Sequence, residues 1–226
     1  MKQAFLPVLL CASFWYALPG FFRPDGHLST KATLLDEAKT PKNDPPKSLE
    51  PQEFVQWVLH PKGPLAKHHT IGDFHLSATY LPPEFMACNK AQGAALSEED
   101  LANAKTELEE MDFFRLRIRV EGAPSPAQYQ ASSRAVYQQR IAYLAFDYQN
   151  DLYLLARDGT RTPCASYVFE RTFSMVPYHT MIVGFPRKGP PDTRQLVVND
   201  QLFGLPPLTF EWSPTDFKVI PKVTLL

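Results

Sequence analysis

Residues 112–120 read Asp-Phe-Phe-Arg-Leu-Arg-Ile-Arg-Val, and their strict alternation decides the fold. The apolar set is Phe114, Leu116, Ile118 and Val120, and the set between them is Arg115, Arg117 and Arg119. Successive side chains of a β-strand point to opposite faces, so this pattern is typical of a strand with one buried face and one polar face. The stretch predicts a sheet that is apolar on one side.

Short strand-like runs continue on both sides of this stretch. Thr70–Tyr80 alternates in the same way, and Asp158-Gly159 is a hairpin signal between two such runs. The predicted strands cover residues 70–80, 112–120, 140–148, 151–156, 163–170, 178–185, 195–198, 201–203 and 208–212, with a helix as the alternative for 140–148. Closely spaced short strands indicate a mainly β (α+β) fold, an antiparallel β-sandwich or barrel-like domain with one or two short helices.

Two segments have helical signals instead. An amphipathic helix is predicted from about Pro51 to Leu59, after an N-cap candidate at Ser48. A second is predicted from Ser97 to Met111, where Ser97-Glu-Glu-Asp100 resembles a capping box and apolar residues then recur at helical spacing.

Composition excludes several classes of protein. The 226 residues are 44% hydrophobic and 21% charged, enough for one sizeable core, and the formal net charge of −1 gives no field that attracts nucleic acid. Proline is frequent, with 22 residues against 10 glycines, which disfavours a helical bundle. Most prolines after Pro64 stand at the borders of predicted strands, where they are tolerated.

The N-terminus has the features of an export signal. Lys2 precedes an uncharged stretch over residues 4–22 that is broken by prolines and is short for a membrane-spanning helix. We expect a leader or anchor over residues 1–20, a flexible tether over 21–48 and a single β-rich domain over 49–226. Cys11 is the candidate lipidation site, as in a bacterial lipoprotein leader. The alternatives are cleavage near Ala17, an uncleaved anchor, or a buried helix of a cytosolic protein.

The remaining cysteines, Cys88 and Cys164, could bridge in an oxidising compartment. A domain of this size does not need a disulfide, so two separately buried thiols are the alternative that we expect.

The order of these pieces resembles a group of uncharacterised bacterial envelope lipoproteins. The likeness lies in the leader and in the quoted runs Pro-Gln-Glu-Phe-Val-Gln-Trp-Val, Tyr80-Leu-Pro-Pro-Glu-Phe, Phe-Phe-Arg-Leu-Arg-Ile, Cys164-Ala…Phe169-Glu170-Arg171 and Val219-Ile-Pro-Lys-Val. The resemblance implies a membrane-anchored location facing the periplasm or exterior, and it implies no reaction.

The arginine row on the 112–120 strand is the candidate ligand-binding feature. Arg115, Arg117 and Arg119 could hold a carboxylate or phosphate through bidentate hydrogen bonds. The alternative is a salt-bridged outer face of a sheet.

Other chemistry-bearing residues form weaker patterns. His68, His69, Asp73 and His75 are capable metal ligands, but their spacing matches no standard zinc site, and we predict no metal and no cofactor. A general acid at Glu170, or a Cys88 or Cys164 nucleophile with His179 as its base, would indicate a hydrolase, yet no catalytic signature surrounds them. The aromatic clusters 113–114, 143–148 and 210–212 belong either to the core or to a ligand groove.

These observations predict a non-catalytic exported lipoprotein that binds a protein or cell-envelope partner. One alternative is a β-domain that binds a small lipid or glycan ligand, and a second is a hydrolase. The expected contacts are the membrane, through an N-terminal lipid or anchor, and an envelope partner, without nucleic acid.

Overall fold

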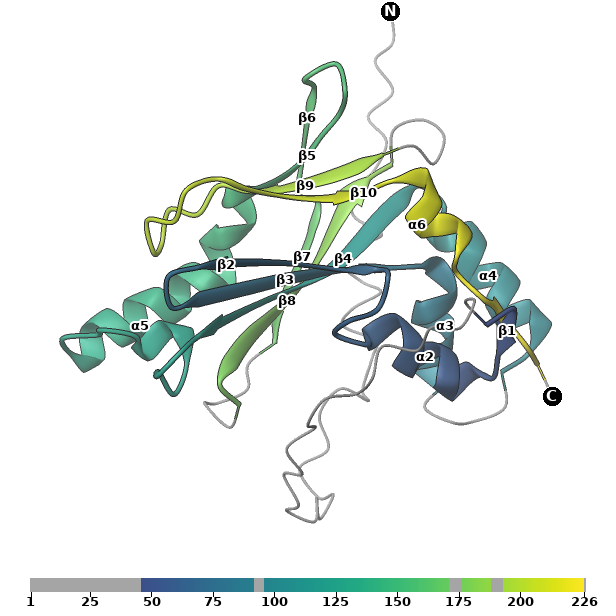
Figure 1. Cartoon of the computed structure of the whole chain (residues 1–226), viewed down its shortest axis with the longest axis horizontal. Helices are drawn as coiled ribbons and strands as arrows, with labels where there is room; N and C mark the ends of the chain where they lie inside the picture. The colour runs from purple at the N-terminus through teal and green to yellow at the C-terminus, as the bar shows by residue number, and fades with distance from the viewer. Residues whose placement is uncertain (1–45, 92–95, 171–175, 188–192, 226) are drawn as a thin grey trace, which may run out of the picture.

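The structure of the protein is a computed structural model that describes residues 46–91, 96–170, 176–187 and 193–225. A five-stranded antiparallel sheet forms its centre, in the order β2-β3-β4-β8-β7 (Figure 1). Its strands are β2 (Ala66–Ile71), β3 (Phe74–Leu81), β4 (Met111–Val120), β8 (Tyr178–Pro186) and β7 (Ser166–Glu170). The alternating stretch 112–120 therefore lies on the central strand.

A four-stranded antiparallel sheet lies over one face of the first, in the order β10-β9-β5-β6. Its strands are β10 (Leu208–Trp212), β9 (Arg194–Val198), β5 (Leu152–Leu155) and β6 (Arg161–Pro163). The β5–β6 hairpin turns at Asp158-Gly159 as predicted, and Gly159 has φ of 83°, a conformation that suits glycine. The run 163–170, predicted as the second strand of this hairpin, is instead divided, because Pro163 ends β6 and residues 166–170 form β7 of the five-stranded sheet.

The core lies between the two sheets. Phe114 of β4 and Trp212 of β10 are fully buried, and their rings lie 4.8 Å apart. The Trp212 indole donates a hydrogen bond of 2.8 Å to the carbonyl of Leu65, so its polar atom is satisfied inside the core. We call the side of the five-stranded sheet that carries Phe114 the inner face, and the opposite side, which carries Arg115, the outer face.

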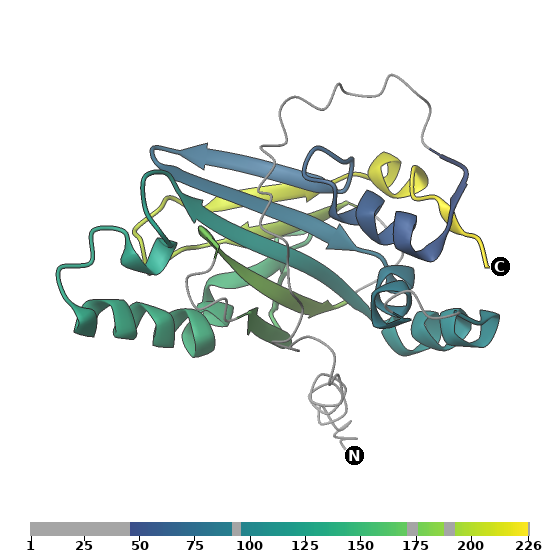
Figure 2. The same ribbon diagram turned by 90° about the horizontal axis from the view of Figure 1, so that it is seen from below.

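Helices close the two ends of this sandwich (Figures 1 and 2). At one end lie α2 (Pro51–Leu59), α3 (Pro83–Ala91), α4 (Glu98–Leu108) and α6 (Pro214–Lys218), and at the other lies α5 (Arg134–Ala142). The N-cap of α2 is Glu50, which forms a capping box with Glu53, and is not the predicted Ser48. The capping box of α4 is formed by Ser97 and Asp100 as its sequence indicates.

The beginning and end of the described chain meet beside these helices. The short strand β1 (Ser48–Leu49) pairs in parallel with β11 (Lys222–Val223). The backbone N–H of Lys222 also donates to the carbonyl of Lys47, at 3.0 Å. The segment that follows the predicted tether is thus bound to the C-terminal strand.

Residues 140–148 correct one prediction, because they form the end of α5 and a helical continuation instead of a central strand. The continuation has π-type and 3-10 turns over Tyr143–Asp147 and Tyr148–Asp151. Leu144 and Tyr148 are fully buried, four positions apart, whereas Phe146 between them is 64% exposed. This burial follows helical periodicity, so the helical alternative was the correct one.

Two smaller predictions also differ from the structure. The expected strand over 70–80 is a hairpin, because Gly72 adopts φ of 54° and turns the chain between β2 and β3. Residues 201–203 are not a strand; the Asp200 carboxylate accepts hydrogen bonds from the backbone N–H groups of Phe203 and Leu205 and holds a turn there.

The predicted fold class is confirmed: the described chain is strand-rich, its two main sheets are antiparallel, and its helices are short. It has more short helices than the one or two expected, since α3, α5 and α6 were not predicted. The predicted leader, Cys11 and most of the tether lie outside the described residues. No helix in the described segments is both long enough and apolar enough to cross a membrane.

Candidate functional site

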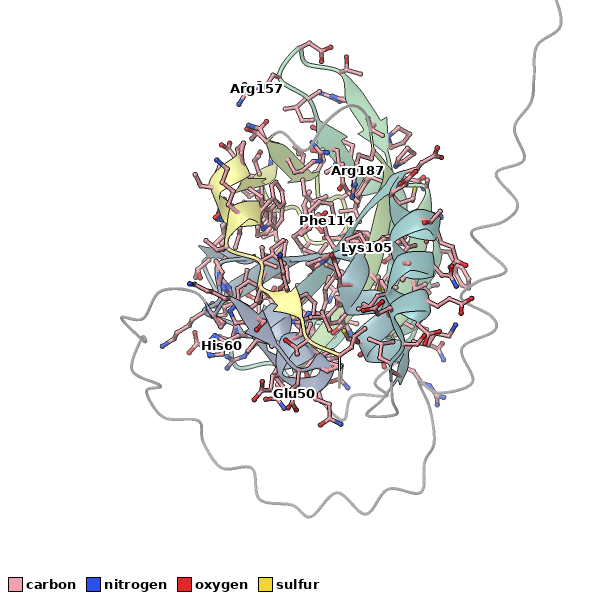
Figure 3. All side chains as sticks on the ribbon, turned by 90° about the vertical axis from the view of Figure 1, so that its right-hand side faces the viewer. Glu50, His60, Lys105, Phe114, Arg157 and Arg187 are labelled. Carbon is pink, nitrogen blue, oxygen red and sulfur yellow. The ribbon has the colours of Figure 1, made fainter. Side chains whose placement is uncertain are left out.

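A pocket of about 520 Å³ opens at the helical end of the sandwich. Its floor comes from the ends of β3, β4 and β9, and its walls come from α3, α4, α6 and the C-terminal segment. Figure 3 looks onto this end, where Arg187 and Phe114 are seen between α6 and α4, and Lys105 belongs to α4. The volume is in the range of small-molecule binding sites.

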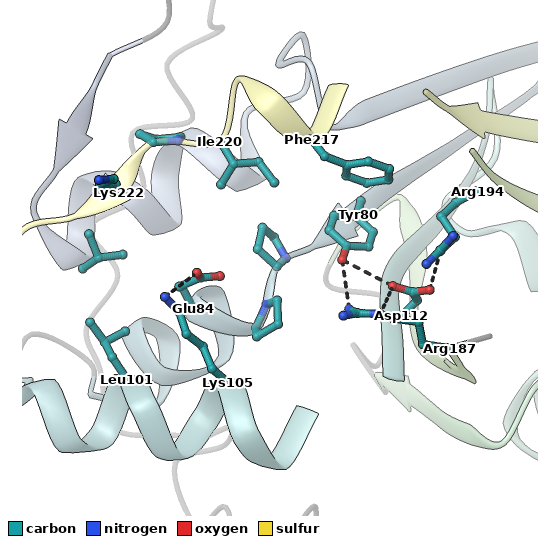
Figure 4. A pocket seen from close by; sticks show the side chains of 14 residues that line it. Tyr80, Glu84, Leu101, Lys105, Asp112, Arg187, Arg194, Phe217, Ile220 and Lys222 are labelled. Atoms are coloured by element: carbon teal, nitrogen blue, oxygen red, sulfur yellow. Dashed lines mark hydrogen bonds and ion pairs between the residues drawn. The ribbon is translucent and has the colours of Figure 1, made fainter. Parts of the chain in front are cut away.

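Asp112 is the centre of a polar group with Tyr80, Arg187 and Arg194, which we call the pocket floor (Figure 4). Its side chain is almost fully buried, and its two oxygens are used separately. Arg187 Nε donates to Oδ1 at 3.0 Å, and Arg194 Nε donates to Oδ2 at 2.5 Å. A buried carboxylate needs such partners, and here one carboxylate lies between two guanidinium groups.

Tyr80 completes the polar floor. Its hydroxyl donates to Asp112 Oδ1 at 3.4 Å and accepts from Arg187 Nη2 at 3.4 Å. Burial, and after it the Asp112 charge, raises the pKa of this phenol well above its usual value, so Tyr80 stays protonated and acts as a donor. The same ring packs edge-on against Phe217 of α6, with the centroids 5.0 Å apart.

The walls of the pocket are apolar, and its rim is charged. Phe217, Ile220 and Leu101 contribute to the walls together with Pro82 and Pro83. Glu84 and Lys105 form an ion pair of 3.1 Å along the rim, and Lys222 lines the same opening (Figure 4). The pocket therefore has a polar floor, apolar walls and charged residues at its entrance.

Among the described residues that line the pocket, cationic side chains outnumber acidic ones. The cationic lining residues are Lys105, Arg187, Arg194 and Lys222, and the acidic ones are Glu84 and Asp112. The excess positive charge favours an anionic ligand, and the apolar walls favour one with a hydrocarbon part. Within the described segments no three histidine, cysteine or acidic side chains come together as a metal site.

The wall formed by α6 and β11 is fixed at both ends. Asp216 of α6 forms an ion pair of 3.0 Å with Lys67 of β2. At its other end, β11 is paired with β1 next to the predicted tether. The C-terminal segment that forms this wall is thus held in place by Lys67 and by β1, both far from it in the sequence.

The three arginines of the predicted row differ in how deeply the structure buries them. All three side chains lie on the outer face, as the alternation predicts, but their exposure is graded: Arg115 is buried, Arg117 is half-buried and Arg119 is exposed. The predicted salt-bridged surface is not found among the described residues, because none of the three forms an ion pair there. They are separate from the pocket, whose lining belongs to other residues.

The histidines near residue 70 do not converge. His69 Nε2 makes a hydrogen bond of 2.8 Å with the carbonyl of Thr209, and His68 Nε2 one of 2.5 Å with that of Pro61. His75 lies near Glu121 and Thr70, while Asp73 accepts from the Tyr129 hydroxyl. Each potential ligand therefore has its own partner in a different direction.

The residues of the predicted hydrolase are also separated. Glu170 of β7 pairs with Thr180 of β8, so these two side chains lie on the same face of the sheet. His179 precedes Thr180 in β8, so it lies on the opposite face from Glu170. His179 is 3% exposed, accepts a hydrogen bond from the backbone N–H of Ala127, and burial lowers its pKa to about 4. Cys88 and Cys164 are free thiols, and burial raises the pKa of each to about 11. Neither thiol is a ready nucleophile at neutral pH.

The pocket residues were missed by sequence reasoning. One signal was available in the sequence. Asp112 lies on the same side of the 112–120 strand as Phe114, Leu116, Ile118 and Val120, so it should point to the core although it is acidic. An acid in that register requires a buried cation. Which cations meet it could not be read, since Arg187 and Arg194 lie 75 and 82 positions away.

No protein-family model matches this sequence, and no curated protein matches it. Among solved structures, a DUF4426 family protein from Pseudomonas aeruginosa is 11% identical with a TM-score of 0.31, over 66% of this chain and 91% of that one. A protein of unknown function from Burkholderia pseudomallei is 10% identical with a TM-score of 0.37, over 78% of this chain and 96% of that one. These likenesses are too distant to suggest an activity for this chain.

Proposed function

We propose that this chain is a non-catalytic binding protein of the cell envelope, and that its pocket takes a small amphipathic anion such as a fatty acid. The observation that carries the proposal is the pocket at the helical end, with Arg187 and Arg194 at its floor and Phe217 and Ile220 in its walls. The carboxylate of a ligand would lie near the guanidinium groups, and its hydrocarbon part would lie along the apolar walls.

The same pocket favours a small ligand over the protein partner that the sequence first suggested. A flat exposed aromatic patch would support a protein contact, whereas Phe114, Phe210 and Trp212 are buried in the core and Phe146 is the one exposed large hydrophobic side chain among the described residues. Apolar walls also fit a lipid better than a glycan, because sugar hydroxyls need more polar partners than these walls provide.

The envelope location is part of this proposal and depends on the N-terminal sequence. A leader with Cys11 as the lipidated residue, followed by a charged and proline-containing tether, would hold the domain near a membrane surface. A domain in that position would meet free fatty acids and lipid fragments.

Calorimetric titration of the full-length chain with octanoate, and with octanol as its uncharged counterpart, tests the ligand class. We expect octanoate to bind ~10-fold or more tightly than octanol, a difference of about 1.4 kcal/mol from one charge-assisted contact. Equal affinities would contradict the role of the arginine floor, and no binding of either compound would overturn the proposal.

Two pairs of variants locate the binding to this pocket. Ile220→Trp should fill the pocket and abolish the part of the octanoate affinity that octanol shares through its hydrocarbon chain, while Thr224→Trp adds the same ring to an exposed site outside the pocket. Lys222→Ala should weaken binding of octanoate, while Lys218→Ala removes an exposed lysine that does not line the pocket. Binding that is unaffected by Ile220→Trp would place the ligand elsewhere.

A further inference from the structure

A second group of charged side chains lies on the outer face of the five-stranded sheet, apart from the pocket. We call Arg115, Arg117 and Glu170 the outer arginine cluster. Arg115 is 9% exposed, and its Nη2 donates to the carbonyl of Leu59, the last residue of α2, at 3.2 Å. Its Nε is buried and has no hydrogen-bond partner. A buried N–H of a charged group that lacks an acceptor is costly, so something should bind it.

Arg117 has the same deficiency one step along the strand. Its Nε is also buried without a partner, although the guanidinium lies 4.5 Å from the centre of the Tyr178 ring. Stacking on an aromatic ring uses the flat face of a guanidinium and leaves its N–H edge available. Two neighbouring guanidinium groups therefore each present an unused donor on one sheet face.

Glu170 is the acid that faces these arginines, but it does not neutralise them. In the register of β4, β8 and β7, Arg117 pairs with Thr180, and Thr180 pairs with Glu170, so Glu170 and Arg117 are in one cross-strand row. No ion pair of 4.0 Å or less joins Glu170 to either arginine among the described residues. Burial raises the pKa of Glu170, and the charges of Arg117 and Arg115 oppose that change.

The cluster therefore holds one positive charge in excess within a half-buried surface. Burial, and after it the charge of Arg117, lowers the pKa of Arg115 to about 10, which leaves the guanidinium charged at neutral pH. Two like charges at neighbouring same-face positions of a strand, roughly 7 Å apart along the backbone, repel each other unless an anion lies between them.

We propose that the outer arginine cluster is a second binding site, which takes the oxyanion of a carboxylate-bearing or phosphate-bearing ligand between Arg115 and Arg117. The ligand enters from the Arg119 side, because exposure rises from Arg115 through Arg117 to Arg119. The Nε–H groups of both arginines donate hydrogen bonds to the bound oxyanion, and its negative charge balances the excess positive charge of the cluster.

This site is independent of the pocket. Arg115 lies on the outer face, whereas Asp112 points to the inner side, where it meets Arg194 of the four-stranded sheet. No residue of the outer arginine cluster lines the pocket. A ligand at one site consequently needs no contact with the other, and Ile220→Trp should leave oxyanion binding unchanged.

Calorimetric titration of the full-length chain with succinate and with inorganic phosphate tests the proposal. Arg117→Gln should weaken binding of the favoured anion ~10-fold or more, because it removes a charged donor. Arg161→Gln is the matched control, since it removes the same charge from an exposed position on β6. Far-UV circular dichroism of each variant checks that the sheet is intact.

Glu170→Gln distinguishes a binding site from a structural charge cluster. If an incoming oxyanion competes with the Glu170 carboxylate, this variant should bind it several-fold more tightly than the wild type. A merely structural role predicts lower stability and no gain in affinity. Binding of succinate alone, of phosphate alone or of both supports the proposal and identifies the oxyanion. It is overturned if neither the wild type nor Glu170→Gln binds either anion, or if Arg117→Gln binds as the wild type does.

Discussion

Asp112 of β4 and Arg194 of β9 join the two sheets of the sandwich through an ion pair of 2.5 Å between Oδ2 and Nε. They are separated by 82 positions in the sequence, and both side chains are buried. Arg187 donates to the other carboxylate oxygen, so Asp112 also connects the sheets to the chain that leaves β8. The polar floor of the pocket therefore also holds the two sheets together.

Asp112→Asn should destabilise the protein strongly. The variant keeps the shape of the side chain but removes the negative charge that lies between two guanidinium groups, and removing one partner of a buried ion pair costs about 3–5 kcal/mol. Urea denaturation followed by circular dichroism measures the change. Glu107→Gln, at an exposed position of α4, is the control and should change the free energy of unfolding by less than about 0.5 kcal/mol. An equally small change for Asp112→Asn would contradict the conclusion that the ion pairs of Asp112 hold the two sheets together.

Gly184→Ala should also destabilise the sheet, for a steric reason. A Cβ at position 184 would lie 2.6 Å from the Phe113 ring and 3.0 Å from Ser166 Cβ. Overpacking of this kind costs about 1–3 kcal/mol. The test is the midpoint of urea unfolding, and the double variant Gly184→Ala with Phe113→Leu should be less destabilised than the sum of the two single changes. Simple additivity would show that the predicted contact does not form.

Acid should weaken the fold through His179. Its pKa is about 4 in the folded protein against 6.5 for an ordinary histidine, because burial disfavours the charged form. The unfolded chain thus binds the proton first, so this contribution is complete above pH 6.5 and is lost as the pH falls toward 4. The loss amounts to about 3 kcal/mol at 1.36 kcal/mol per pKa unit.

The measurement is the free energy of unfolding at a series of pH values for the wild type and for His179→Gln. Glutamine retains an acceptor for the Ala127 N–H but does not titrate. The difference between the two curves isolates the histidine from carboxylates such as Glu170, whose raised pKa has the opposite effect. Parallel curves across this range would show that His179 is not buried in its neutral form.

Cys11→Ala should release the protein from the membrane fraction if the leader is lipidated. The wild type should have the intact mass of a chain that begins at Cys11 and carries acyl groups, while the variant should retain the leader or be cleaved elsewhere. Cys88→Ala, which removes a buried thiol in α3, is the control and should stay lipidated. If wild type and Cys11→Ala both keep the full leader and are soluble, the anchoring proposal fails.

Much of the sheet could be predicted because its strands carry their burial pattern locally. Phe114, Leu116 and Ile118 face the core, with arginines on the other side, as the alternation indicates. Residues 140–148 were predicted wrongly because a short apolar run has no clear period; the helix became evident only through the burial of Leu144 and Tyr148. A run of that kind takes its conformation from its neighbours.

The candidate site was much less predictable than the fold. The sequence predicts that the three arginines share one face of the strand. It could not show that Arg115 is buried beside Leu59 while Arg119 is exposed to solvent. A contact with the end of α2, 56 positions away in the sequence, thus distinguishes Arg115 from the other members of the row. The pocket was not visible at all, since its residues come from six separate segments of the chain.

The sequence by itself determined the strand-rich class, the two faces of the central strand and the helix starts at residues 51 and 98, because these depend on contacts between near neighbours. Only the tertiary structure decided that Asp112 meets Arg187 and Arg194, and that Glu170 faces Arg115 and Arg117 across the sheet. Charges interact according to their separation in space, and a folded chain sets that separation through sheet order and register, which no local pattern contains.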